Sequence, residues 1–209
     1  MKKRNFFVNG LIVLTLSAGV FGITGCSKTS DSQLSAVAPL SSSDSLALVH
    51  MREEEKLARD VYQGLYNLYG TKIFTNIASS EQVHMDRVLT VLNTYGITDP
   101  ASSQVGVFVN PDIAQLYDKL MAQGKKSFLE ALKVGAEIED LDIYDLQNFL
   151  LTTKNQEIKT LFSFLECGSE NHMRAFSKQL TQNGVNYVPQ YISEIKYQEI
   201  ISSTSAGCQ

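Results

Sequence analysis

The chain has 209 residues, of which 44% are hydrophobic and 19% charged, and its formal net charge is −4. This length suffices for one domain with a hydrophobic core, and the acidic balance argues against a nucleic-acid-binding protein, which needs a basic face. Its three cysteines are too few for a disulfide-rich scaffold and lack the paired spacing of a zinc site.

Residues 1–25 are typical of a secretory signal peptide. A basic run at 2–4 is followed by a mostly apolar run at 6–20 and then by Ile-Thr-Gly directly before Cys26. That last segment resembles the lipobox of bacterial lipoproteins, which implies cleavage before Cys26 and a lipid on its sulfur. An uncleaved membrane anchor over 6–24 is the alternative. We therefore expect a protein anchored to a membrane of the cell envelope, on the periplasmic or surface side.

The segment after the lipobox is rich in serine and has no apolar period. Residues 26–44 are therefore predicted to be a lipidated cysteine followed by a flexible tether. The folded domain is expected over 45–201, and 202–209 is expected to be a tail.

The domain begins with two long predicted helices. Asp44 or Ser45 is the expected N-cap of the first helix, which ends just before Gly70. The second helix is predicted over 71–95 and ends at Gly96.

A connector helix and two further long helices complete the prediction. Asn110-Pro111 starts the connector, which ends near Gly124, because proline suits the first helical position. Long helices follow over 127–151 and 155–183, and 187–191 is expected to be extended and packed across the helices. Four helices of about 25 residues would each be about 37 Å long. The sequence therefore predicts an all-α four-helix bundle with a long crossover between its second and third helices.

Each long predicted helix has an apolar stripe that polar residues interrupt near its middle. The interruptions are Glu55 on the first helix, Glu81 and His84 on the second, Glu139 and Asp142 on the third, and Ser169 and His172 on the fourth. A buried carboxylate without a partner is costly, so this shared pattern predicts one polar centre that holds cations. Oxygen and imidazole ligands without thiolate suit iron or manganese, with zinc as a less exclusive alternative.

Several of these residues resemble those of a known protein family. Residues 55–62 look like the Glu-x-x-Ala-Arg-x-x-Tyr motif on the first helix of rubrerythrin-type ferritin-like proteins. Glu81 and His84 resemble their Glu-x-x-His motif on the second helix. Glu139 matches the single glutamate of the third helix, and His172 matches the histidine of the fourth.

The resemblance extends over most of the predicted domain. Residues 46–201 are similar to a bacterial domain-of-unknown-function family placed in the ferritin-like superfamily, with hallmarks at 51–62 and 168–176. It implies a ferritin-like bundle with a metal centre, but no settled activity.

The chain departs from the ferritin-like pattern on the fourth helix. Ser169 stands where that pattern has a second bridging carboxylate, and Asp142 could supply the missing oxygen. The alternatives are a mononuclear site on Glu55, Glu81 and His84, or an asymmetric dinuclear site that adds Glu139, Asp142 and His172. Tyr62 and Ser169 would lie beside the ligands, and Tyr62 could hydrogen-bond a ligand, relay an electron or simply pack in the core.

Other polar residues have structural interpretations. Glu53 and Glu54 are expected to be a solvated charge run, and His50 is expected at the surface or rim. Arg59 and Arg174 could pair with the core carboxylates and leave a salt-bridge network without metal.

Two cysteines remain besides the one with the predicted lipid. An exported compartment permits a disulfide between Cys167 and Cys208. The sequence does not predict whether they lie within reach of each other.

Two functions of different classes fit these patterns. One is a redox enzyme whose mono- or dinuclear iron or manganese centre reacts with dioxygen or peroxide. Because a rubredoxin-like Cys-x-x-Cys pair is absent, electrons would come from an external donor. The other is a non-catalytic module that binds or senses metal at the cell envelope. A metal-free structural protein is the third interpretation, and a homodimer is compatible with all three.

Overall fold

The computed structural model describes residues 40–204 and 207–208, and within these residues the secondary-structure elements are all helices, joined by non-helical connections. This confirms the predicted all-α class. The predicted signal peptide, the lipid on Cys26 and residues 27–39 of the tether lie outside the described residues. In the described part of the chain, no helix combines the length and the hydrophobicity that crossing a membrane requires.

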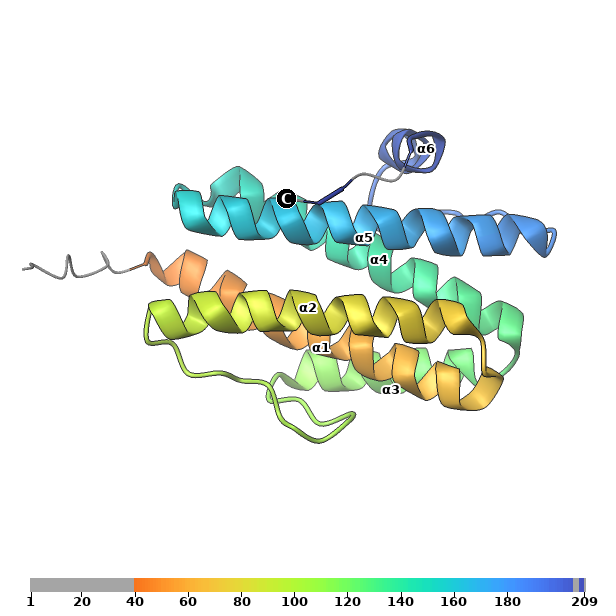
Figure 1. Ribbon diagram of the computed structural model, residues 1–209, viewed down its shortest axis with the longest axis horizontal. Helices are drawn as coiled ribbons and strands as arrows, with labels where there is room; N and C mark the ends of the chain where they lie inside the picture. Colours follow the sequence, from red (N-terminus) through yellow and green to blue (C-terminus); the bar gives the residue numbers. More distant parts are fainter. Residues whose placement is uncertain (1–39, 205–206, 209) are drawn as a thin grey trace, which may run out of the picture. The chain divides into compact units, whose positions relative to one another are not determined.

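The described residues contain six helices (Figure 1). They are α1 (Ser42–Tyr69), α2 (Lys72–Thr94), α3 (Pro111–Gly124), α4 (Phe128–Thr152), α5 (Gln156–Gln182) and α6 (Glu194–Ser202). The first five match the predicted helices to within a few residues. The sixth was not predicted: Ser193 caps it, and Tyr197 and Ile200 are its buried residues.

The start of α1 differs from the prediction. Ser41 is the N-cap, and its hydroxyl accepts a hydrogen bond from the Asp44 backbone N–H at 3.1 Å. Asp44 instead lies in the first turn, where a negative charge faces the positive end of the helix dipole, and it accepts from the Ser41 hydroxyl at 2.8 Å. The other end follows the prediction, because Gly70 adopts the left-handed conformation with φ of 66°.

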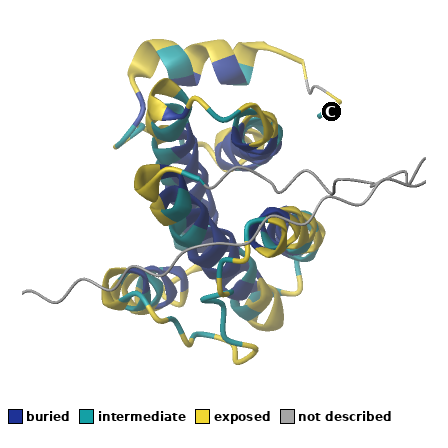
Figure 2. Ribbon diagram, turned by 90° about the vertical axis from the view of Figure 1, so that its left-hand side faces the viewer, coloured by how far each residue is buried: buried dark blue, intermediate teal, exposed yellow. Residues whose placement is uncertain are grey.

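Two helical hairpins form the frame of the domain. The first pairs α1 with α2 and the second pairs α4 with α5, while α1 also contacts α4 and α2 also contacts α5. Helix α3 packs on α1 and α4, and α6 packs on α5. Figure 2 shows the long helices with their buried sides turned toward one another. The central turns of α1, α2, α4 and α5 therefore face a common interior.

The interior contains two apolar clusters with polar residues between them. One cluster is built around Tyr62, Phe74 and Phe176, and the other around Leu48 and Phe162. Along α1, α2 and α5, the two clusters lie on opposite sides of the predicted polar interruptions. The core thus encloses these interruptions on both sides.

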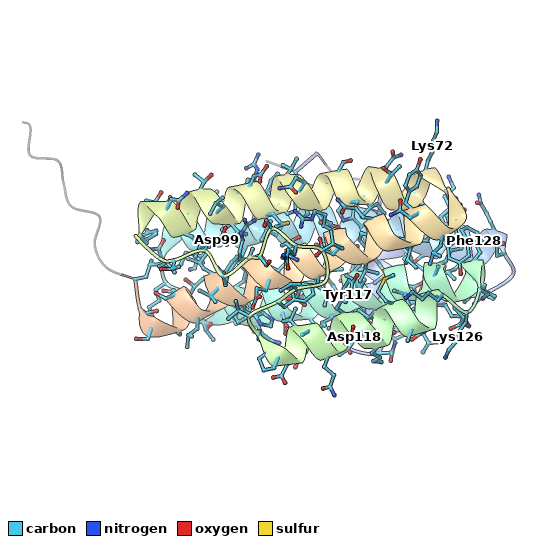
Figure 3. The ribbon with its side chains drawn as sticks, turned by 90° about the horizontal axis from the view of Figure 1, so that it is seen from below. Lys72, Asp99, Tyr117, Asp118, Lys126 and Phe128 are labelled. Carbon is cyan, nitrogen blue, oxygen red and sulfur yellow. A yellow bond between two sulfur atoms is a disulfide. The ribbon has the colours of Figure 1, made fainter. Side chains whose placement is uncertain are left out.

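The long connection between α2 and α3 lies against α1. Asp99, labelled in this connection in Figure 3, accepts hydrogen bonds from Arg52 Nε and Nη2 at 2.9 and 2.8 Å. Glu53 accepts from the backbone N–H groups of Val109 and Asn110 at 2.5 and 2.9 Å. These contacts explain part of the charge run on α1 as an anchor for the connection.

Two further residues of α1 hold the same connection. Lys56 and Asp60 form a fully buried ion pair at 2.5 Å. Lys56 also donates to the Gln104 carbonyl at 2.9 Å, and Asp60 accepts from the Gly106 N–H at 2.9 Å.

The prediction that Glu53 and Glu54 are solvated was wrong. Each is only 2% exposed. The connection contacts Glu53. Glu54 lies beside Asp145 of α4, and His50 is close to both Glu54 and Asp145. The helical stripe could not reveal this, because a separate segment of the chain provides the cover.

Asp140 of α4 anchors the segment between α5 and α6. Its carboxylate accepts from the backbone N–H groups of Gln190, Tyr191 and Ile192 at 2.5, 3.2 and 2.9 Å. It also accepts from the Tyr187 hydroxyl at 2.8 Å. The segment predicted to pack across the helices is therefore fixed to α4.

A disulfide joins Cys167 of α5 to Cys208, with the Cα atoms 5.7 Å apart. This answers the question that the sequence left open. The bond ties the end of the described chain to α5, directly before Gly168.

Candidate metal centre

Five of the predicted ligands meet at mid-length of α1, α2, α4 and α5. All five are buried, with exposed fractions of 2% for Glu55, Glu81, His84 and Glu139 and 8% for His172. They form two groups, and in each group the potential ligand atoms lie within 4.8 Å of one another.

The first group consists of Glu55, Glu81 and His84. His84 Nδ1 lies 3.0 Å from Glu55 Oε2 and 2.8 Å from Glu81 Oε2. Glu81 and His84 are three residues apart on α2, so they share one face of that helix, and Glu55 reaches them from α1.

The second group consists of Glu81, Glu139 and His172. His172 Nδ1 lies 2.9 Å from Glu81 Oε1 and 3.4 Å from Glu139 Oε2. Glu81 belongs to both groups, and its two oxygens face different histidines. The rings of His84 and His172 are 5.6 Å apart between centroids. The arrangement can therefore hold two cations with Glu81 as a bridge.

Several atoms of this centre are buried without a hydrogen-bond partner. They include Glu55 Oε1, Glu81 Oε1 and His172 Nδ1. Glu81 Oε1 and His172 Nδ1 are 2.9 Å apart, but their alignment is not that of a hydrogen bond. A buried polar atom left unpaired costs about 1–3 kcal/mol. A cation bound between such atoms would satisfy them, so the donor set fits a metal.

The salt-bridge alternative predicted from the sequence is not formed. Arg59 instead pairs with Asp60 at 2.8 Å and donates to Gln82 at 2.6 Å. Arg174 donates to the Ile200 carbonyl at 3.1 Å.

Within residues 40–204 and 207–208, the ion pairs of the three central glutamates are made with histidines alone. No permanent cation of the protein therefore neutralises these carboxylates in the part of the chain that is described.

Burial and mutual charge govern protonation at the centre. Burial raises the pKa of Glu55 to about 8, although the nearby His84 opposes the shift. Burial also raises the pKa of Glu139, whereas the two histidines lower the pKa of Glu81 against its burial. For His84 and His172, the carboxylates overcome burial and raise the pKa well above its usual range. In the metal-free chain, these shifts favour protonated His84 and His172 beside the carboxylates.

Tyr62 fixes Glu139 from the side of α1. Its hydroxyl donates a hydrogen bond to Glu139 Oε1 and also lies 3.3 Å from the Gly135 carbonyl. Its ring packs against Phe74 and Phe176, with centroids 6.5 and 5.4 Å away. Burial and the charge of Glu139 raise the pKa of Tyr62 well above its usual range, so the hydroxyl keeps its proton. Of the roles considered for Tyr62, the structure places it in hydrogen-bond contact with a predicted ligand.

Gly168 is a residue of this centre that the stripe analysis did not select. A Cβ atom at this position would lie 2.4 Å from His84 Nε2. Glycine therefore leaves the space for the imidazole, and the ring presents Nδ1 to Glu55 and Glu81. A glycine in a helix costs about 1 kcal/mol relative to alanine. The sequence could have indicated Gly168, because this glycine directly precedes Ser169 of the polar interruption on the same helix.

Asp142 and Ser169 pair with each other beside the two groups. The Ser169 hydroxyl donates to Asp142 Oδ2 and also lies 3.0 Å from the Leu165 carbonyl. Asp142 Oδ1 is buried without a hydrogen-bond partner. Burial and the charges of Glu55 and Glu54 raise the pKa of Asp142 well above its usual range. Asp142 thus lies near the centre without belonging to either group.

The chain is similar in sequence and in structure to an archaeal protein, and one family model matches most of it. The chain is 53% identical over 168 residues to the uncharacterized protein MJ0754 of Methanocaldococcus jannaschii, which covers 80% of this chain and 91% of that protein. The crystal structure of the hypothetical protein MJ0754 from Methanococcus jannaschii DSM 2661 is similar to this fold. Its TM-score is 0.79 at 53% identity, covering 80% of this chain and 97% of that chain. The family model for the uncharacterized protein domain DUF2202 matches residues 44–204. The chain therefore belongs to the DUF2202 family.

Proposed function

We propose that this chain is a ferritin-like four-helix-bundle protein that binds two iron or manganese ions and supports their redox reaction with dioxygen or hydrogen peroxide. One observation carries the proposal: two buried carboxylate–histidine groups share Glu81. The frame of two hairpins, with α3 in the long connection between them, is compatible with a ferritin-like bundle.

The donor set supports the choice of metal. Carboxylate oxygens and imidazole nitrogens without thiolate suit iron and manganese, and zinc is the alternative. Glu55 and His84 would hold one ion and Glu139 and His172 the other, while Glu81 would bridge them. If Asp142 turned from Ser169 it could add an oxygen.

The protein residues would control protons and water around such ions. A pair of redox-active ions can change oxidation state and so exchange electrons with dioxygen or peroxide. Tyr62 holds its proton toward Glu139 and keeps that carboxylate oriented. The apolar clusters on both sides limit the access of water, and His172 is the most exposed of the five residues at 8%. Electrons would come from an external donor.

A non-catalytic metal-binding or sensing module is the second candidate. Ser169 favours it, because this hydroxyl occupies the place of a bridging carboxylate and is engaged with Asp142. Fewer anionic ligands would stabilise the oxidised metal less. The two candidates share the same ligands and differ in turnover.

We also propose that the protein is exported and anchored to a membrane of the cell envelope by a lipid on Cys26. The basic, apolar and Ile-Thr-Gly-Cys segments of residues 1–26 support this proposal. The disulfide between Cys167 and Cys208 supports it independently, because such bonds persist in oxidising compartments.

Peroxide kinetics on the iron-loaded chain separate the two candidates. Rapid oxidation of bound ferrous iron by hydrogen peroxide, lost in Glu81→Ala, would support the enzyme. Val83→Ala is the matched control, because Val83 lies on the same helix and is 50% exposed. Tight binding without oxidation would support the module. If the loaded chain retains no iron, manganese or zinc, both candidates are wrong.

A further inference from the structure

A third group of potential ligands lies outside the buried centre and shares no residue with it. It consists of His50 and Glu54 on α1 and Asp145 on α4, whose ligand atoms lie within 4.8 Å of one another. His50 Nε2 is 3.0 Å from Asp145 Oδ2 and 3.3 Å from Glu54 Oε2. The side chains of His50 and Asp145 are 30% and 23% exposed, so the group is open to solvent on one side.

Glu54 is the unusual member of this group. Its side chain is only 2% exposed, and both of its carboxylate oxygens are buried without a hydrogen-bond partner. His50 Nε2 can carry at most one hydrogen, and the hydrogen-bonded contact of that atom is with Asp145. One proton therefore cannot satisfy both carboxylates, whereas a cation at the same place would contact all three ligand atoms.

The surroundings add negative charge and no permanent cation. In the described residues, the ion pairs of Glu54 and Asp145 are made with His50 alone. Asp142 lies near enough to Glu54 to interact with it electrostatically. Although burial opposes it, the two carboxylates raise the pKa of His50 to about 10. A metal ion bound to Nε2 would take the place of a hydrogen there.

We propose that His50, Glu54 and Asp145 form an outer binding site for a divalent transition-metal ion, separate from the buried centre. His50 and Glu54 are four residues apart on one face of α1, and Asp145 completes the set from α4. One imidazole and two carboxylates suit Mn²⁺, Fe²⁺ or Zn²⁺. Three protein ligands and an open side leave room for water molecules, as in zinc sites that keep an exchangeable position.

Titration of the full chain with Mn²⁺, followed by the loss of the free-ion signal in electron paramagnetic resonance, tests this proposal. Asp145→Asn and His50→Gln should each bind one ion fewer than the parent. Asp118→Asn is the matched control, because Asp118 is an exposed acid on α3, labelled in Figure 3. It should bind as many ions as the parent.

The Glu81→Ala/His84→Ala variant separates this proposal from the one on the buried centre. That variant should still bind one Mn²⁺ ion, and adding Asp145→Asn should abolish it. If the buried centre binds no metal at all, the parent should still bind one ion that Asp145→Asn removes. Equal numbers of bound ions in the parent, Asp145→Asn and His50→Gln would overturn the outer site.

A second readout does not depend on stoichiometry or on altering the core. In NMR spectra of the parent, Zn²⁺ should shift the ring signals of His50, because the imidazole would bind the ion. Ring signals of His50 that stay in place at saturating Zn²⁺ would overturn the proposal.

Discussion

Glu81 is the residue on which the two buried groups depend. Its oxygens lie 2.8 Å from His84 Nδ1 and 2.9 Å from His172 Nδ1. Glu55 and Glu139 each face one histidine of the pair. The three glutamates thus have unequal roles, although the sequence presents them as equivalent interruptions of apolar stripes.

This inequality predicts different losses of metal from two variants. If the centre binds two ions as proposed, Glu81→Ala should lose both, because it removes a shared residue from each group. His172→Gln should lose one ion and retain the other on Glu55, Glu81 and His84. Elemental analysis after metal loading measures both, with Val83→Ala as the control. If Glu81→Ala bound as much metal as the parent, the assignment of the centre would be wrong.

The substitution Gly168→Ala has two opposing effects on stability, a gain in helix propensity and a steric clash with His84. Alanine favours the helix by about 1 kcal/mol over glycine, but its Cβ would lie 2.4 Å from His84 Nε2. Because overpacking a buried site costs about 1–3 kcal/mol, Gly168→Ala should lower the free energy of unfolding and weaken metal binding.

Urea denaturation of the parent and Gly168→Ala measures the difference. Gly207→Ala is the control, because nothing lies within 4 Å of a Cβ built there. An unchanged or higher stability of Gly168→Ala would mean that His84 does not depend on this space.

The pKa of Glu55 predicts a pH dependence for the metal-free chain. Burial raises it from 4.5 to about 8, so the folded chain binds a proton that the unfolded chain has lost within this interval. The free energy of unfolding should therefore decrease as the pH rises from 4.5 to 8. The raised pKa values of His84 and His172 act in the same direction.

Urea denaturation at pH 6 and pH 8 in the presence of a chelator measures this slope. Glu55→Gln should flatten it, because the amide does not titrate. A metal-free chain that became more stable between these pH values would contradict the prediction.

At the scale of the helices, periodicity and caps predicted five of the six helices in the described part of the chain. Gly70, Pro111 and Gly124 mark ends that short-range chemistry determines. Helix α6 was missed because its nine residues carry only two buried apolar positions, Tyr197 and Ile200. A stripe this short does not stand out from an irregular tail.

The same local reasoning could predict the residues that meet in the buried centre but not the third group. Glu55 interrupts an apolar stripe and is therefore visible in the sequence. Glu54 is buried beside Asp145 of α4, and the connection after α2 contacts Glu53. Contacts between segments far apart in the sequence have no period, so the charge run on α1 looked solvated. For the same reason, the sequence did not show whether Cys167 and Cys208 lie close enough to form their disulfide.

Asp140 provides a test at this scale. Asp140→Ala would leave the N–H groups of Gln190, Tyr191 and Ile192 and the hydroxyl of Tyr187 without their acceptor. We expect a loss of about 3 kcal/mol in the free energy of unfolding, since an unsatisfied buried donor costs about 1–3 kcal/mol.

Metal binding of Asp140→Ala should stay at the parent level, because Asp140 contacts the segment before α6 rather than the centre. Denaturation and metal titration on the same sample measure both quantities, with Asp118→Asn as the control. A large loss of metal without a loss of stability would contradict the separation of anchor and centre.

At the scale of the domain, the two hairpins explain why polar residues can share one interior. Each hairpin alone contributes part of the set: Glu55, Glu81 and His84 from α1 and α2, and Glu139 and His172 from α4 and α5. The first group is complete within one hairpin, whereas the second needs Glu81 from the other. Metal binding should therefore link the hairpins and stabilise their packing.

The central claim is that the buried centre holds two metal ions around Glu81. Anomalous diffraction from crystals of the iron- or manganese-loaded chain tests it most directly. We predict two anomalous peaks between the hairpins, one in contact with Glu55 and His84, the other with Glu139 and His172, and both with Glu81. The absence of both peaks after loading, with the glutamates and histidines still paired to one another, would contradict the claim.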